Sequence, residues 1–226
     1  MKKFLFTFTT LVSLNCWAAQ PEAIIKESFY IGSLNDFSSN IVQAYTKNGV
    51  AERDARATVD FLKTEMDLLA VKKKVMDCFE EKKLYQQDLT KEQFPVVEKC
   101  LAPLTKSFQE QNAAYQKKGI PTAGVYAVYL MVENEDVVKN LLTENNVPDI
   151  YALLATQIGY SRLDLKKWRN EIQNCIVKNK PNTQEVTKEE FETFYKCSYG
   201  FGEALIKEAS GAVTEFIDAE STGAKK

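Results

Sequence analysis

The sequence predicts an all-α protein built as a tandem duplication of a three-helix unit. Glycine and proline are scarce, with nine and six residues in a chain of 226, and this composition favours helices over strands joined by tight turns. Cysteines recur at a fixed interval, because 22 residues separate Cys78 from Cys100 and the same number separates Cys175 from Cys197. The second pair lies 97 residues after the first.

The interval of 97 residues also relates longer stretches of the chain, as an internal repeat does. Residues 46–100 and 143–197 are identical at 15 of 55 ungapped positions, whereas about three identities are expected by chance at ordinary composition. The matches include the Thr-Lys-Glu stretches that begin at Thr90 and Thr187. Two unrelated helical segments would not keep so many identities in one register.

Residues 1–18 have the three parts of a secretory signal peptide. Lys2 and Lys3 form a cationic start, a mostly apolar run without charges follows, and Ala18 closes the segment. The run is shorter than the roughly twenty residues that a bilayer-spanning helix needs. We therefore expect an exported protein in the periplasm or, alternatively, in the extracellular space, and no membrane span. Lipidation of Cys16 is a less favoured alternative.

The repeat divides the exported part of the chain into two units and a tail. The first three-helix unit is expected at 19–119 and the second at 120–219, while the small and charged residues 220–226 should be disordered. In the first unit, the spacing of apolar residues predicts one helix over 22–47 and a second over 51–82. The third helix should begin at the Thr-Lys-Glu stretch.

Matching signals mark the helix ends of the two units. Residues 48–49 are Asn-Gly and residues 145–146 are Asn-Asn, and both pairs should end a first helix because these residue types tolerate a left-handed cap. Thr90 and Thr187 are each followed three residues later by Gln or Glu, which is the pattern of a capping box at a helix start. The third helices should therefore begin there.

Proline and glycine are expected to interrupt the third helices. Pro103 and Gly200 occupy the same position after the second cysteine of each unit, where the helix should kink or pause. Gly200 and Gly202 together should break the helix in the second unit. Pro95 should delay the start of the third helix in the first unit.

The spacing of the cysteines predicts two disulfides. An even number of cysteines remains after removal of the signal peptide, which in an exported chain indicates bridges rather than free thiols. Cys78 and Cys100 flank the Thr90 helix start at similar distances, so they should face each other in a helical hairpin, as should Cys175 and Cys197. Each bridge should contribute about 3 kcal/mol to stability. Redox activity or zinc binding would need more closely spaced cysteines.

Residues 89–93, Leu-Thr-Lys-Glu-Gln, resemble the LTxxQ motif of the small helical periplasmic chaperones. The resemblance covers five residues, and the second unit departs from it at Val186 and Glu190. A capping box accounts for the same residues, so no family is assigned from this motif.

The composition excludes several kinds of site. The chain has no histidine, which removes Ser-His-Asp and Cys-His nucleophiles as well as histidine-ligated metals and haem. The formal charge of −2 and the pI near 5.5 argue against a nucleic-acid-binding surface. We therefore expect no cofactor, no metal and no catalytic residue. Asp67 and Asp164 form a matched carboxylate pair, for which a solvated face or an ion pair is the favoured interpretation.

The expected function is binding of another protein, as an inhibitor or immunity protein, a chaperone or an envelope adaptor. A carboxylate-based cell-wall hydrolase and a secreted factor that acts outside the cell are the alternatives. The densest aromatic cluster lies between 191 and 201, and it is expected to be mostly core around the second disulfide. Its C-terminal part should reach a partner, with binding residues Tyr195, Tyr199, Phe201 and Leu205.

Overall fold

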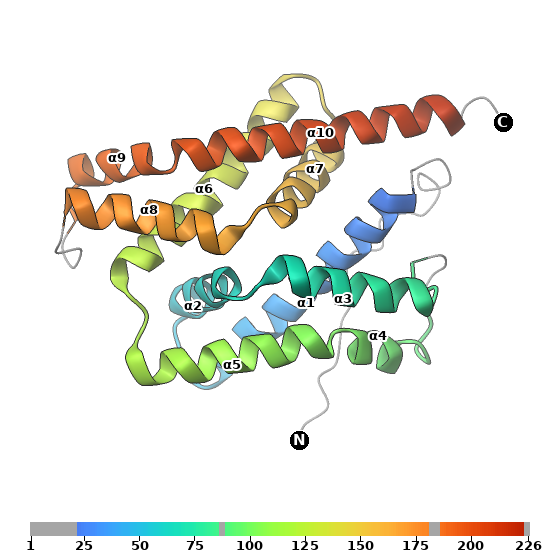
Figure 1. Cartoon of the computed structure of the whole chain (residues 1–226), viewed down its shortest axis with the longest axis horizontal. Helices are drawn as coiled ribbons and strands as arrows, with labels where there is room; N and C mark the ends of the chain where they lie inside the picture. The colour runs from blue at the N-terminus through green and yellow to red at the C-terminus, as the bar shows by residue number, and fades with distance from the viewer. Residues whose placement is uncertain (1–21, 86–88, 181–185, 224–226) are drawn as a thin grey trace.

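In the computed structural model, the described residues 22–85, 89–180 and 186–223 are entirely helical apart from turns (Figure 1). This absence of strands in the described residues confirms the predicted all-α class. Ten helices occur there, five in each half of the chain. The first five are α1 (Glu22–Lys47), α2 (Glu52–Glu65), α3 (Leu68–Glu81), α4 (Phe94–Cys100) and α5 (Ala102–Lys118). The last five are α6 (Thr122–Glu144), α7 (Asp149–Arg162), α8 (Leu165–Asn179), α9 (Lys188–Cys197) and α10 (Tyr199–Gly223).

The prediction of three helices in each unit is wrong, because the second and third expected helices are each divided in two. The helix expected over 51–82 is α2 followed by α3, with a break at Met66 and Asp67. Met66 has an extended backbone, and the Asp67 carboxylate accepts a hydrogen bond from the backbone N–H of Ala70 at 3.0 Å. Asp67 therefore caps a new helix, and it satisfies one of the donors that every helix start leaves unpaired.

The same break recurs 97 residues later, between α7 and α8. Leu163 is extended, and the Asp164 carboxylate accepts a hydrogen bond from the backbone N–H of Lys167 at 3.0 Å. The bounds of α7 lie 97 residues after those of α2. The turns before these two helices also correspond, since Gly49 and Asn146 have positive φ values of 87° and 65°. The tandem duplication itself stays a prediction.

The helices expected at the two Thr-Lys-Glu stretches begin differently. At the start of α9, the Thr187 side chain accepts a hydrogen bond from the N–H of Glu190, and the Glu190 carboxylate accepts one from the N–H of Thr187. The predicted capping box is therefore complete in the second half. In the first half the Gln93 side chain accepts from the N–H of Thr90 at 2.8 Å, but α4 begins only after Gln93. Pro95 lies in the first turn of α4, where its missing N–H costs no hydrogen bond.

The pauses predicted after the second cysteines are confirmed, at Leu101 between α4 and α5 and at Ser198 between α9 and α10. The prediction that Gly200 and Gly202 break a helix is wrong, because both lie in the first turn of α10. A Cβ atom on Gly202 would lie 2.4 Å from the Oδ1 atom of Asn134 on α6. The missing side chain therefore lets α10 pack closely against α6.

Both predicted disulfides are present. Cys78 is bonded to Cys100, and Cys175 is bonded to Cys197. The first bridge joins α3 to α4, and the second joins α8 to α9. Each one therefore closes a helical hairpin within its own half of the chain.

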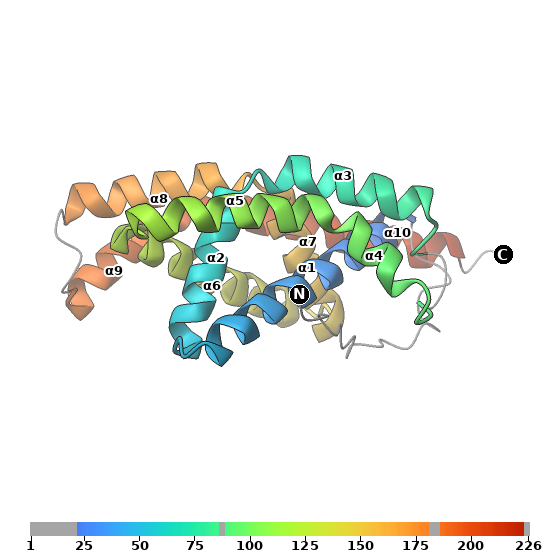
Figure 2. The ribbon, with the colours of Figure 1, turned by 90° about the horizontal axis from the view of Figure 1, so that it is seen from below.

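The two halves lie side by side, with α1–α5 in the lower part of Figure 1 and α6–α10 in the upper part. Seen from below, α8, α5 and α3 run along one side of the molecule (Figure 2). The contacts between the halves are reciprocal, because α2 contacts α6 and α8 while α7 contacts α1 and α3. Such reciprocity is typical of an interface with two-fold symmetry.

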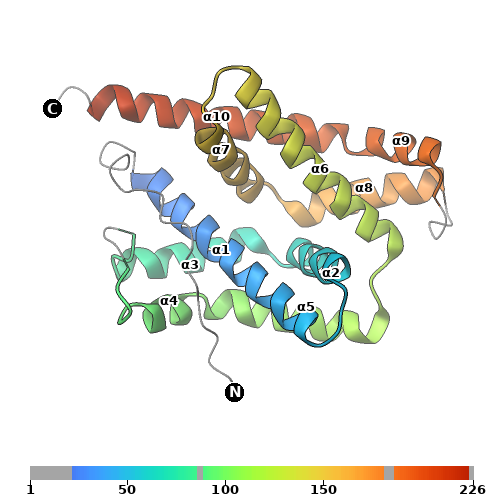
Figure 3. The same ribbon diagram turned by 180° about the vertical axis from the view of Figure 1, so that it is seen from behind.

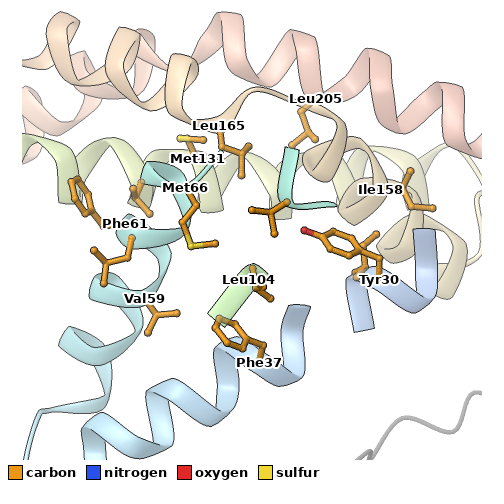
Figure 4. Packing of buried hydrophobic residues seen from close by; sticks show 14 of the residues in the cluster. Tyr30, Phe37, Val59, Phe61, Met66, Leu104, Met131, Ile158, Leu165 and Leu205 are labelled. Atoms are coloured by element: carbon orange, nitrogen blue, oxygen red, sulfur yellow. The ribbon is translucent and has the colours of Figure 1, made fainter. Parts of the chain in front are cut away.

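One hydrophobic core extends through both halves. Figure 4 shows buried side chains from the first half, such as Tyr30 and Leu104, in the same cluster as Ile158 and Leu205 from the second. All four side chains are at most 1% exposed. The halves therefore stabilise each other through shared apolar burial.

Two predictions concern the ends of the chain. The signal peptide expected at 1–18 lies outside the described residues. The tail expected to be disordered from residue 220 is helical as far as Gly223, where α10 ends, and residues 224–226 lie outside the described part. Within that part, no helix combines the length and the apolar character needed to cross a membrane.

Candidate functional site

The structure divides the predicted partner-binding residues between the core and the surface. Phe201 and Leu205 are 0% exposed, and the Phe201 ring lies 5.9 Å from the ring centres of Tyr160 and Trp168. These two side chains are core residues, so they present no surface to a partner. Tyr199 is 54% exposed, and Tyr195 is half-buried beside it with 5.8 Å between the ring centres.

An aromatic row connects these two tyrosines to α6. The ring of Tyr129 on α6 lies 5.7 Å from that of Phe191 on α9. Phe191 and Tyr195 are four residues apart on α9, which places them on one face of that helix, and Tyr195 contacts Tyr199. Tyr129 is 51% exposed. The row therefore begins and ends with a solvent-exposed tyrosine.

Exposed apolar residues continue from Tyr129 along the outer side of α6. Val132, Val137 and Leu141 are all exposed, and Val137 reaches 46%. At 3.6 residues per turn, Tyr129, Val137 and Leu141 lie within about 120° of one another around the helix. Val132 lies at the other edge of the exposed half, about 180° from Leu141. In Figure 3 this helix crosses in front of α8 and α10, so that one of its sides faces outward. We call the α6–α9 surface the set Tyr129, Val132, Val137, Leu141, Phe191, Tyr195 and Tyr199.

Exposed apolar residues are concentrated in the second half of the chain. Eleven large apolar side chains are exposed among the described residues, and nine of them lie on α6–α10, including Ile150 and Leu153 on α7. For eight of the nine, the residue 97 positions earlier is small, polar or charged. These eight earlier residues are Gly32, Asn35, Asn40, Ala44, Arg53, Arg56, Glu80 and Ala102. The first half has polar or small residues where the second half exposes apolar side chains.

Acidic residues lie among the apolar residues of α6. Glu133 and Asp136 are spaced so that they share a helix side with Val132 and Val137. A hydrogen bond to Glu133 raises the pKa of the Tyr129 hydroxyl above its ordinary value, so the carboxylate and the exposed ring lie together. The α6 part of the surface therefore carries both apolar side chains and carboxylates.

The Asp67 and Asp164 pair has a structural role that the sequence analysis did not identify. Both side chains are exposed, and both cap a helix. Lys72, on the helix that Asp67 caps, is buried and pairs with Glu27.

A buried charge cluster joins the two halves. Glu27 on α1 accepts hydrogen bonds from Lys72 on α3 and from Arg162 on α7, and Arg162 also donates to Glu215 on α10 at 2.9 Å. Burial raises the pKa of the Glu27 carboxyl, but the hydrogen bonds and charges of Arg162 and Lys72 outweigh it and hold the pKa below its ordinary value. Because its charges are paired inside the fold, this cluster is a structural junction.

The pKa of one carboxyl, that of Glu135, lies near neutral pH, as general acid–base catalysis requires. Burial raises the pKa of Glu135 on α6 to about 7, the charges of Asp60 and Asp136 add to this, and Lys63 opposes it. An open pocket of about 480 Å³ lies elsewhere, between α1 and α2, and Glu135 does not line it. The residues that line this pocket are Ser39, Val42, Gln43, Thr46, Val50, Glu52 and Arg56. Within the described residues, no group of three or more Cys, Asp or Glu side chains is arranged to hold a metal ion.

Comparison with models of protein families, with curated proteins and with solved structures finds no match. Function is therefore inferred from the exposed side chains, their charges and their spacing. The contribution of α6 to the surface was not predicted from the sequence. A comparison of residues 97 positions apart could have found it, since Tyr129 corresponds to Gly32 and Val137 to Asn40.

Proposed function

We propose that the protein acts by binding another protein through the α6–α9 surface. The observation that carries the proposal is the one-sided distribution of exposed apolar residues, with nine of eleven on α6–α10 in the described part of the chain. Single exposed apolar residues are normal on any protein, but a row of them on one helix side is typical of an interaction surface. Tyrosine is also among the residue types that contribute most to binding free energy.

The surface is held in shape before any partner arrives. The Cys175–Cys197 bridge joins α8 to α9, next to Tyr195 and Tyr199. Beneath the row, Phe194 is 1% exposed and its ring lies 6.0 Å from that of Tyr126 on α6. A surface on a rigid base loses little conformational entropy when it binds, so more of the contact energy is retained as affinity.

We also infer that the chain arose by tandem duplication, with units at 19–119 and 120–219. The matching bounds of α2 and α7, the caps at Asp67 and Asp164 and the reciprocal contacts between the halves support this origin. On this account both units kept the bridge and the caps, which stabilise the fold. Nine of the eleven exposed large apolar residues in the described part of the chain lie on the second unit, as expected if this unit binds the partner.

Export is part of the same proposal. The segment 1–18 has the pattern of a signal peptide, and two disulfides are typical of an oxidising compartment such as the periplasm or the extracellular space. A partner would then be an envelope or extracellular protein. The geometry favours this function over a carboxylate-based hydrolase, because Glu135 does not line the pocket.

Site-specific photo-crosslinking tests the proposed function. Benzoylphenylalanine would replace Val137 or Tyr199 on the α6–α9 surface, and Val50 or Leu69 as matched exposed apolar positions in the first half. The protein would be produced in cells of its natural source with the disulfides formed. We expect one defined protein adduct from Val137 and from Tyr199, and none from Val50 or Leu69. Equal adducts at all four positions, or no adduct at any, would contradict the proposal.

A further inference from the structure

We propose that the partner presents a basic amphipathic helix, which lies along α6 with its apolar side on Tyr129, Val137 and Leu141. This inference rests on the proposed function, and it adds the chemical class of the binding segment. Three features of the α6–α9 surface support it: the spacing of the apolar residues, their interleaving with carboxylates, and the exposed tyrosine faces at its end.

The spacing of the apolar residues fits a helix. Tyr129 and Leu141 are twelve residues apart on α6, which corresponds to about 18 Å along the helix axis. A partner helix with apolar residues at i, i+4, i+7 and i+11 presents an apolar stripe of about the same length. An extended strand would instead need an open sheet edge to pair with, and the described residues contain no strand.

The charges on α6 select a basic partner. Apart from Glu135, whose pKa burial raises to about 7, its sequence holds Glu133, Asp136 and Glu144 against one cation, Lys139. Asp136 is exposed between Val132 and Val137, so a lysine or arginine beside the partner's apolar stripe would face this carboxylate. Complementary charge of this kind selects the partner and speeds its association.

The tyrosines at the end of the row add a second contact for cations. Tyr199 is 54% exposed and packs edge-on against Tyr195. A guanidinium or ammonium group placed over an exposed tyrosine ring gains a cation–π interaction. An arginine near one end of the partner helix would contact the Tyr199 ring as part of the same surface.

A second copy of this chain is a poor occupant of the surface. In a symmetric dimer the same patch meets itself, so the α6 carboxylates of one copy would face those of the other. Like charges at an interface oppose association. The acidic surface therefore favours a different, basic partner over self-association.

Two synthetic peptides of about sixteen residues test the inference with the full exported chain and intact disulfides. Both carry leucine at the positions of the apolar stripe, and the remaining positions are lysine in one and glutamate in the other. Fluorescence anisotropy should show the lysine peptide binding at least about tenfold more tightly, with affinity falling between about 50 mM and about 300 mM salt. The Val137→Ser and Leu141→Ser double variant should weaken the lysine peptide at least about tenfold.

A matched pair of charge variants separates specific recognition from general attraction to an acidic protein. Glu133→Gln with Asp136→Asn should weaken the lysine peptide at least about fivefold. Glu52→Gln with Asp54→Asn, on α2 of the first half, removes the same charge and should change the affinity less than about twofold. Equal loss in both double variants would overturn the inference, as would equal binding of the two peptides.

The crosslinking result distinguishes a failure of the basic-helix proposal from a failure of the proposed protein-binding function. An adduct at Val137 together with no preference for the lysine peptide would overturn the basic helix and leave protein binding in place. No adduct at Val137 or Tyr199 would overturn the proposed function itself. A concentration-dependent dimer in analytical ultracentrifugation that Val137→Ser abolishes would identify a second copy as the occupant and so overturn the basic helix.

Discussion

Lys72 and Arg169 lie 97 residues apart, and each is a buried cation that pairs with a carboxylate on another helix. Lys72 pairs with Glu27 of its own half, whereas Arg169 pairs with Glu65 of the other half. Arg162 extends the first pair across the molecule, with its Nη2 atom 2.6 Å from the Oε2 atom of Glu27. Two charge pairs, Arg162 with Glu27 and Arg169 with Glu65, therefore join the two halves.

Removal of the shared carboxylate should destabilise the fold. Glu27→Gln leaves Lys72 and Arg162 next to each other without the negative charge that both contact, and uncompensated buried charge costs about 3 kcal/mol. Urea unfolding at neutral pH measures this loss. Glu52→Gln breaks an exposed pair with Arg56 and should change the free energy of unfolding by less than about 0.5 kcal/mol. Equal effects of the two substitutions would show that the Glu27 cluster is not a structural junction.

The half-buried carboxyl of Glu135 should make stability fall as pH rises. Its pKa of about 7 in the folded protein lies above the ordinary value of 4.5, so the folded state holds a proton that the unfolded state releases. The contribution to stability is full below about pH 4.5 and is lost as pH rises through about 7. Between pH 5 and pH 8, the wild type should lose about 2 kcal/mol relative to Glu135→Gln. The same change in the free energy of unfolding with pH in the wild type and in Glu135→Gln would contradict this pH dependence.

Substitution by alanine should change the stability of the protein in opposite directions at two glycines on packed helices. A Cβ atom on Gly159 of α7 would lie 2.8 Å from the backbone N atom of Ala209 on α10, and that backbone atom cannot move aside cheaply. Gly159→Ala should therefore cost about 2 kcal/mol. Gly211 on α10 has open space around it, so Gly211→Ala should stabilise the protein by about 0.5 kcal/mol. Thermal unfolding of the two variants measures these changes. A loss of stability in both variants would mean that Gly211 lies in a tighter contact.

Alanine substitution should affect stability differently at Phe201 and at Tyr199, because Phe201 lies in the core and Tyr199 on the surface. Phe201→Ala removes a side chain that is 0% exposed and should lower the free energy of unfolding by about 3 kcal/mol. Tyr199→Ala removes an exposed ring and should change it by less than about 0.5 kcal/mol. Chemical denaturation of both variants provides the measurement. Similar losses would mean that Tyr199 is also part of the core.

The features that the sequence predicted correctly depend on residues close together in the chain. The two disulfides follow from cysteines spaced around a helix start, and the Thr187 capping box involves only Glu190, three residues away. The local sequence also signalled the breaks at Asp67 and Asp164, because each has an aspartate whose side chain can cap a helix. The apolar stripe that continues across the break nevertheless indicated one continuous helix. Local signals of this kind are available before any tertiary contact forms.

The burial of Phe201 and the exposure of Tyr199 could not be predicted in this way. The two residues differ by two positions on α10, and which of them is buried depends on where Tyr160 and Trp168 lie in the folded chain. The α6–α9 surface likewise joins residues that are more than fifty positions apart, such as Tyr129 and Phe191. Only the packing of α6 against the C-terminal helices brings these side chains together.

The most direct test of the central claim is the affinity of matched surface variants for the partner that crosslinking identifies. Val137→Ser with Tyr199→Ser removes exposed apolar area from the α6–α9 surface, and Val50→Ser with Leu69→Ser removes exposed apolar area from the first half. In isothermal titration calorimetry, the first double variant should bind at least about tenfold more weakly than wild type, and the second should stay within about twofold. Equal affinity loss in both, or loss only in the first-half variant, would contradict a binding surface on the second half.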